Sequence, residues 1–276
     1  MTHRSTLGTL VSLIGAALGI VGSLLIFVRI YFPMIALENA VGRPDEGIIV
    51  KYIFPALNDV SILGGVLWAL AAFAFYKGLH WAWHLGVIAN VIALQGSFFT
   101  MIPPLSRGES PLMAVVFIPN LIFFFLLLRV VRQVDWRVVW FTLFAGMTFV
   151  LCFMNGVASM NKIMVTEDLT HRALFVGVQQ LNWIASIAWG VCVIAMIFGK
   201  PWSKYVGLGA ALMGLVGGGP LAVLNTIEAN QISMFTPGPA LGLVLAAILL
   251  LVSIDPWLSR EGAAGAVELR DAGHTA

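Results

Sequence analysis

Eight long apolar stretches run through this chain of 276 residues, each close to the thickness of a bilayer. A helix that rises about 1.5 Å per residue needs roughly 20 apolar residues to cross about 30 Å of hydrocarbon. Backbone polar groups find no water there, so only helices and closed barrels can span it, and barrel strands are shorter and alternate in polarity. The sequence therefore predicts an all-α integral membrane protein with eight transmembrane helices. The stretches are Leu7–Ile30, Asn58–Tyr76, Trp81–Ile102, Leu112–Val131, Val138–Asn155, Ala173–Phe198, Lys204–Leu224 and Pro237–Ile254.

Composition and charge agree with this class. Apolar residues make up 60% of the chain and charged residues 10%, against roughly 45–50% and 25% in soluble proteins. With the N-terminus in the cytoplasm, nine Lys and Arg residues fall on the inner side and six on the outer side. The positive-inside rule then favours a multi-pass protein of the cell (inner) membrane with both termini cytoplasmic. Its expected partners are membrane lipids and other membrane subunits or further copies of the chain, and no nucleic acid.

A shift of 121 residues aligns the chain with itself and superimposes several uncommon residues. The shift also superimposes three predicted helices of the first half on three of the second. We therefore expect two four-helix repeats in parallel orientation, over residues 1–135 and 136–256, followed by a flexible cytoplasmic tail at 257–276. The aligned pairs are Trp68 and Trp189, Trp81 and Trp202, Gly78 and Gly199, Gly86 and Gly207, Gly96 and Gly217, and Met113 and Met234.

Polar side chains and breaks in the backbone pattern gather toward the outer leaflet. Amides and hydroxyls there could line a cavity open to the outside, or could hydrogen-bond between helices. Gly217-Gly218-Gly219-Pro220 is expected to unwind or kink its helix, and interrupted helices at matching repeat positions are typical of binding sites. No charged residue falls near a helix centre, so a ligand would be neutral or amphipathic. The candidate ligand-binding residues are Gln95, Thr100, Asn120, Gln179, Asn182, Gly217, Gly218, Gly219 and Pro220.

No motif in the chain predicts catalysis, a metal or a cofactor. His80 and His84 have helical spacing but no third ligand nearby. His171 with Glu167 or Asp168 is either an acid–base group or part of a capped helix start. The layout of two four-helix units resembles haem A synthase in helix count alone, and no histidine here falls inside a predicted bundle. We therefore expect no catalytic residue, no metal and no cofactor.

Outside the membrane, the segment 32–57 has two halves rich in apolar residues on either side of the turn-forming run Arg43–Gly47. It is expected to form two short amphipathic pieces on the outer face, as a lid or a docking surface. Three functions remain open. The first is binding or passage of a small neutral or amphipathic, lipid-like molecule through an outward-facing polar cavity. The others are a non-catalytic structural subunit of a larger membrane complex and a membrane enzyme acting on lipid.

Overall fold

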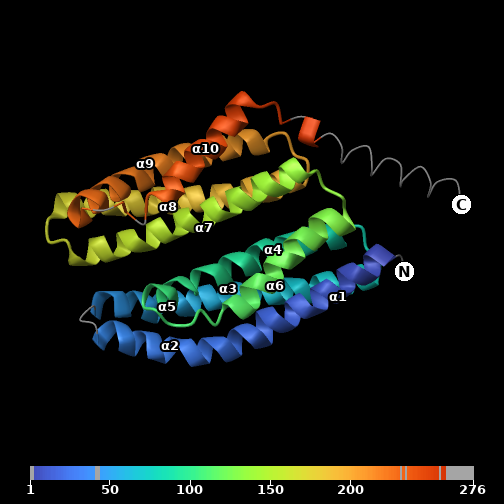
Figure 1. The fold of residues 1–276 in the computed structure, drawn as a ribbon, viewed down its shortest axis with the longest axis horizontal. Helices are drawn as coiled ribbons and strands as arrows, with labels where there is room; N and C mark the ends of the chain where they lie inside the picture. The colour runs from blue at the N-terminus through green and yellow to red at the C-terminus, as the bar shows by residue number, and fades with distance from the viewer. Residues whose placement is uncertain (1–2, 41–43, 231, 234, 255, 259–276) are drawn as a thin grey trace, which may run out of the picture. The chain divides into compact units, whose positions relative to one another are not determined.

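A computed structural model describes residues 3–40, 44–230, 232–233, 235–254 and 256–258 of the chain. All regular structure in these ranges is helical. The chain divides into two compact units, Met1–Gln133 and Val134–Ala276, whose helices are labelled in Figure 1. The predicted tail falls almost entirely outside the described residues.

Within the described ranges, seven helices are long and apolar enough to cross a membrane. This confirms the prediction of a multi-pass helical membrane protein. The eighth predicted stretch forms α10 (Pro237–Leu251), which has 15 residues and ends where Val252 adopts extended backbone angles. Its length of about 22 Å is less than the hydrocarbon thickness. The seven long spans are Arg4–Ala40, Val50–Tyr76, Ala82–Leu105, Ala114–Val131, Trp136–Val165, Leu169–Ile197 and Ser203–Ile227.

The first unit is a bundle in which four long helical segments contact one another in a ring. Its first segment is continuous from α1 through the π-helical turn η1 to α2, and it packs on α3. Helix α3 packs on α4, α4 on α6, and α6 with η2 returns to α1. The elements are α1 (His3–Ala17), η1 (Leu18–Gly22), α2 (Ser23–Ala40), α3 (Pro44–Tyr76), α4 (Ala82–Phe99), α5 (Ile102–Ser106), α6 (Ala114–Phe125) and η2 (Leu126–Val131).

Glycine lets the first two helices of this bundle approach closely. A Cβ atom added to Gly19 would lie 2.6 Å from the Cα of Gly65, and one added to Gly15 would lie 2.8 Å from the ring of Trp68. Hydrophobic burial does not drive helix association in lipid, so close van der Waals packing between small residues takes over that role. Gly15, Gly19 and Gly65 are therefore packing residues.

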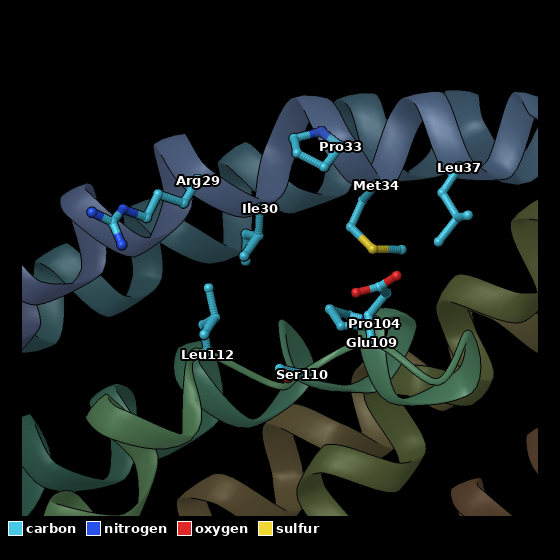
Figure 2. A pocket seen from close by; sticks show the side chains of 9 residues that line it. All are labelled: Arg29, Ile30, Pro33, Met34, Leu37, Pro104, Glu109, Ser110 and Leu112. Atoms are coloured by element: carbon cyan, nitrogen blue, oxygen red, sulfur yellow. The ribbon is translucent and has the colours of Figure 1, made fainter.

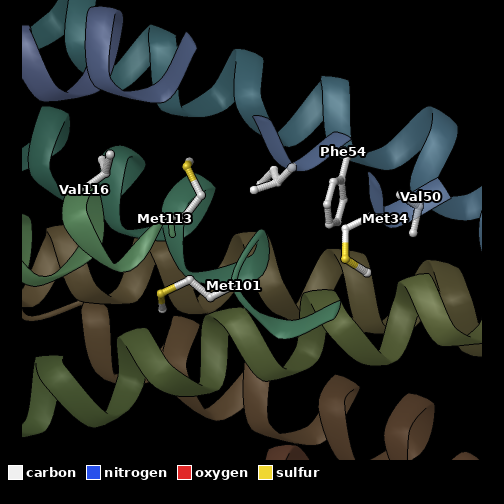
Figure 3. Packing of buried hydrophobic residues seen from close by; sticks show 7 residues of the cluster. Met34, Val50, Phe54, Met101, Met113 and Val116 are labelled. Carbon is white, nitrogen blue, oxygen red and sulfur yellow. The ribbon is translucent and has the colours of Figure 1, made fainter. Parts of the chain in front are cut away.

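The segment 32–57 differs from the predicted pair of short surface pieces. Helix α2 continues to Ala40 and α3 begins at Pro44, so both halves are the ends of long helices. A proline at the first helical position suits a helix start, and residues 41–43 lie outside the described ranges. A buried cluster joins these ends to the rest of the unit (Figure 3). Its members are Ile30, Met34, Val50, Phe54, Met101, Met113 and Val116.

The second unit is also a ring of four helices. Helix α7 packs on α8, α8 on α9, α9 on α10, and α10 returns to α7. Asp135 caps α7 by accepting a hydrogen bond from the backbone N–H of Arg137. The remaining long helices of the unit are α7 (Trp136–Val165), α8 (Leu169–Ile197) and α9 (Ser203–Ala229).

Helix α9 corrects one expectation from the sequence. The run Gly217–Pro220 was expected to unwind or kink the helix. The structure does not unwind it, because α9 is continuous from Ser203 to Ala229 with Pro220 inside it. A proline removes one backbone donor from a helix, and neighbouring groups in a membrane protein can satisfy the carbonyl that it leaves free. The glycines instead give neighbouring side chains room, as described below.

Candidate functional site

In the first unit, Asn120 is the centre of a hydrogen-bonded seam between α3, α4 and α6. Trp68 Nε1 donates to Asn120 Oδ1 at 3.0 Å, and Asn120 Nδ2 donates to the carbonyl of Val116 at 2.8 Å. Asn90 Nδ2 donates to the backbone carbonyl of Asn120 at 2.8 Å. Asn120 is fully buried, and both ends of its amide have partners within the protein. Its role here is to join three helices.

The other two candidates of this unit differ from each other. The hydroxyl of Thr100 donates to the carbonyls of Gly96 and Ser97 at 3.2 and 3.0 Å, within its own stretch of helix. Gln95 is 6% exposed, and neither atom of its side-chain amide has a partner in the described part of the chain. Of the three candidates, Gln95 alone therefore has unused hydrogen-bonding capacity on both sides of its amide.

In the second unit, the structure brings Asn182 of α8 against the glycines of α9. A Cβ added to Gly217 would lie 3.0 Å from Asn182 Nδ2, and one added to Gly218 would lie 3.3 Å from Asn182 Oδ1. Asn182 is fully buried, and its Nδ2 donates to the carbonyl of Val178 at 2.8 Å. Its Oδ1 has no partner among the described residues. An unpaired amide oxygen thus lies where glycines of α9 face α8.

Asn155 of α7 joins the same place, although the sequence-based list of candidates left it out. Its Nδ2 lies 3.0 Å from the position of a Cβ on Gly218 and donates to the carbonyl of Phe235 at 3.2 Å. The signal for Asn155 was present in the sequence, as an asparagine that ends an apolar stretch. The other predicted residues do not join this group as closely. Gln179 and Gly219 are half-buried and Pro220 is exposed.

A buried ion pair in the first unit was not predicted. Arg107 Nε donates to Glu38 Oε1 at 2.9 Å, and Arg107 Nη2 bonds the second carboxylate oxygen. The Glu38 side chain is 3% exposed and that of Arg107 17%. Both were expected on the same side of the membrane with opposite charges, but the reading of 32–57 as surface pieces hid the pairing. The pair fixes the end of α2 to the segment that follows α5.

Next to this pair lies a groove of about 260 Å³ between α2 and residues 104–112 (Figure 2). Its walls are largely apolar, and two charged side chains, Arg29 and Glu109, line it at different positions along α2. In Figure 2, Arg29 points away at one end, while Glu109 approaches Met34 toward the other. The lining residues are Arg29, Ile30, Pro33, Met34, Leu37, Pro104, Glu109, Ser110 and Leu112.

The titratable residues that the sequence offered as candidates for catalysis or metal binding lie at or near the starts of α4 and α8. Asp168 caps α8 by accepting from the backbone N–H groups of Thr170 and His171, and these bonds lower the pKa of its carboxyl. His171 Nδ1 lies 2.8 Å from Asp168 Oδ2 at the exposed helix start. His80 precedes the first residue of α4, so it does not share a helical face with His84. The described residues contain no group of three potential metal ligands, and the three methionine sulfurs in Figure 3 do not converge.

Comparison with known proteins places this chain in no group. No family model, no curated protein and no solved structure matches it.

Proposed function

We propose that this multi-pass membrane protein binds or passes a small neutral or amphipathic, lipid-like molecule at polar positions inside its units. One observation carries the proposal. Gln95 in the first unit and Asn182 in the second are buried at 6% and 0% exposure, and they retain amide atoms that have no partner among the residues that the structure describes.

Unpaired polar atoms in a protein interior lower the stability of the folded state. Leaving a buried donor or acceptor unpaired costs about 1–3 kcal/mol, and most buried polar groups in folded proteins have a partner. A hydroxyl, carbonyl or ether group of a ligand, or a water that accompanies it, would supply the missing bonds. The long spans contain few charged residues, so a ligand without net charge fits them.

The test is to replace each amide with leucine in the full-length protein and to measure both bound small molecules and stability. Gln95→Leu and Asn182→Leu are expected to lose co-purifying molecules in native mass spectrometry, with thermal stability unchanged or raised. Thr100→Val is the matched control, because its hydroxyl is already bonded within its helix. Unchanged adducts together with a loss of stability would assign the amides to helix association and contradict the proposal.

We also propose that the two units are parallel repeats, with α10 as an eighth crossing and both termini in the cytoplasm. Several pairs separated by 121 residues have matching surroundings. A Cβ on Gly86 would lie 3.6 Å from Cζ3 of Trp68, and one on Gly207 would lie 3.7 Å from Cζ3 of Trp189. Both tryptophans are fully buried.

The turns after the second helix of each unit support the same relation. Gly78 and Gly199 have φ angles of 67° and 66°, the left-handed geometry of a glycine that ends a helix. The N–H of Leu79 bonds the carbonyl of Ala74, and the N–H of Lys200 bonds that of Ala195, again 121 residues apart. An experimental structure whose halves do not superimpose at this offset would contradict the repeat. Cysteines can be placed at each terminus and labelled from one side of the membrane. Labelling that locates the two termini on opposite sides would contradict the topology.

A second candidate function is that of a structural subunit of a larger membrane complex, or of a homo-oligomer. Exposed aromatic residues at the ends of α2 and α3 favour it: Phe32 is 70% exposed and Tyr52 is 66% exposed. Native mass measurement in detergent distinguishes the candidates. Stoichiometric co-purification of another chain or copy supports the subunit, and a stable monomer that retains small molecules supports the binding protein.

A further inference from the structure

The positions of charged residues in the first helical segment indicate where the groove of the first unit lies relative to the membrane. Ser5–Val28 contains no Asp, Glu, Lys or Arg, and Arg29 is the next charged residue. This uncharged stretch is roughly 36 Å long as a helix, which is enough to cross the hydrocarbon. Arg29 therefore lies where hydrocarbon gives way to lipid headgroups, and the groove begins at Arg29.

The groove has a rigid apolar floor. Ile30 and Met34 line it and also belong to the buried cluster that joins α2 to the bundle. The Glu38–Arg107 pair holds its two walls together just beyond Leu37. Side chains in the interior and in a bidentate ion pair have fixed rotamers, so this site is formed before a ligand arrives.

Two side chains of opposite charge, Arg29 and Glu109, line the groove. Arg29 and Glu109 are both exposed, and neither forms an ion pair with another residue in the described part of the chain. Along α2 the groove extends from Arg29 to Leu37, which is about 12 Å of helix. A positive group at one end of an apolar floor and a negative group farther along it, opposite Met34, complement a zwitterion (Figure 2).

We propose that this groove binds the headgroup of a zwitterionic phospholipid that carries a primary ammonium, namely phosphatidylethanolamine. The guanidinium of Arg29 suits bidentate bonding to the phosphate. The carboxylate of Glu109 accepts from the ammonium, and Ile30, Met34 and Leu112, which lie between the two charged residues, contact the two methylene groups of the ethanolamine. A volume of about 260 Å³ is below that of pockets for drug-sized ligands, roughly 300–1,000 Å³. It therefore takes a headgroup, while the acyl chains remain on the lipid-facing surface.

This site is separate from Gln95 and Asn182, so it stands or falls apart from the proposed function. The experiment titrates the full-length protein in detergent with phosphatidylethanolamine, phosphatidylcholine and phosphatidylglycerol of identical chains, read by native mass spectrometry. We expect phosphatidylethanolamine to bind about 10-fold more tightly than phosphatidylglycerol, as a charge-assisted hydrogen bond implies. Phosphatidylcholine, whose ammonium has no N–H donor, should be intermediate.

Two variants and one control locate the effect. Glu109→Gln should abolish the preference for phosphatidylethanolamine over phosphatidylglycerol, and Arg29→Gln should weaken both about 10-fold. Arg4→Gln, near the other end of the same helix, should change neither. Both site residues are exposed, so unchanged thermal stability is the check on folding. A preference that persists in Glu109→Gln, or equal binding of all three lipids, would overturn the proposal. So would equal binding of soluble glycerophosphoethanolamine, or occupation of the groove by a protein partner.

Discussion

Replacing Arg107 with leucine tests whether the buried ion pair holds α2 in place. Glu38 would remain as a carboxylate whose side chain is 3% exposed, with its bidentate partner removed. Removing one partner of a buried pair costs about 3–5 kcal/mol. Because the Arg107 side chain is 17% exposed, water can reach part of the vacated site, and we expect the lower value of about 3 kcal/mol.

The assay is unfolding of the full-length protein in detergent, followed by tryptophan fluorescence during heating and during titration with a denaturing detergent. The double variant Glu38→Met with Arg107→Leu replaces both charges with apolar groups of similar length. Such replacements are often neutral or stabilising, so the double variant should recover most of the loss. The reasoning is refuted if Arg107→Leu has the stability of the parent, or if the two substitutions are additive.

Further substitutions test the packing and capping of the bundles. Gly218→Ala would bring a Cβ within 2.7 Å of a proline ring of α10 and should cost about 1–3 kcal/mol of stability by overpacking. Gly219→Ala is the control, because a Cβ there would have nothing within 4 Å, and it should be neutral or slightly stabilising in the same unfolding assay. Asn120→Ala should cost about 1–3 kcal/mol by leaving the Trp68 indole unpaired, and a loss that adds fully to that of Trp68→Phe would count against this bond. Because its pKa is lowered in the folded state, the Asp168 carboxylate stabilises the start of α8 above its unfolded pKa of about 3.9, and this contribution is lost as pH falls through the lower folded value. Hydrogen exchange of the first turn of α8 should therefore increase at acidic pH, corrected for its intrinsic rate, and the increase should be absent in Asp168→Asn, which retains a capping side chain.

The site residues show why sequence reasoning identified polar positions but could not assign their roles. Asn120 and Gln95 look alike in sequence, since each is an amide in an apolar stretch. The structure bonds Asn120 at both ends of its amide, whereas the Gln95 amide has no partner in the described ranges. The difference depends on the rotation of each helix about its axis and on the side chains of neighbouring helices, which no local pattern specifies.

The two corrected expectations have a related cause. The rules for glycine, proline and turns describe chains in water, where a broken helix can bond to solvent. Gly217–Pro220 lies inside a continuous helix, because hydrocarbon offers its backbone no other partner. The segment 32–57 was interpreted as surface pieces because Arg43–Gly47 is typical of a turn between two amphipathic halves, whereas Met34 and Phe54 belong to one buried cluster.

The membrane class of this protein follows from its residues alone, because transfer of a helix into hydrocarbon depends on the sum of side-chain contributions along one segment. Long apolar segments are sufficient to place a protein in this class, whichever helices they contact. The ion pair between Glu38 and Arg107, 69 residues apart, and the groove beside it arise only when separate helices are brought into contact. Their geometry depends on the distances and rotations of those helices, which are set by packing across the whole unit.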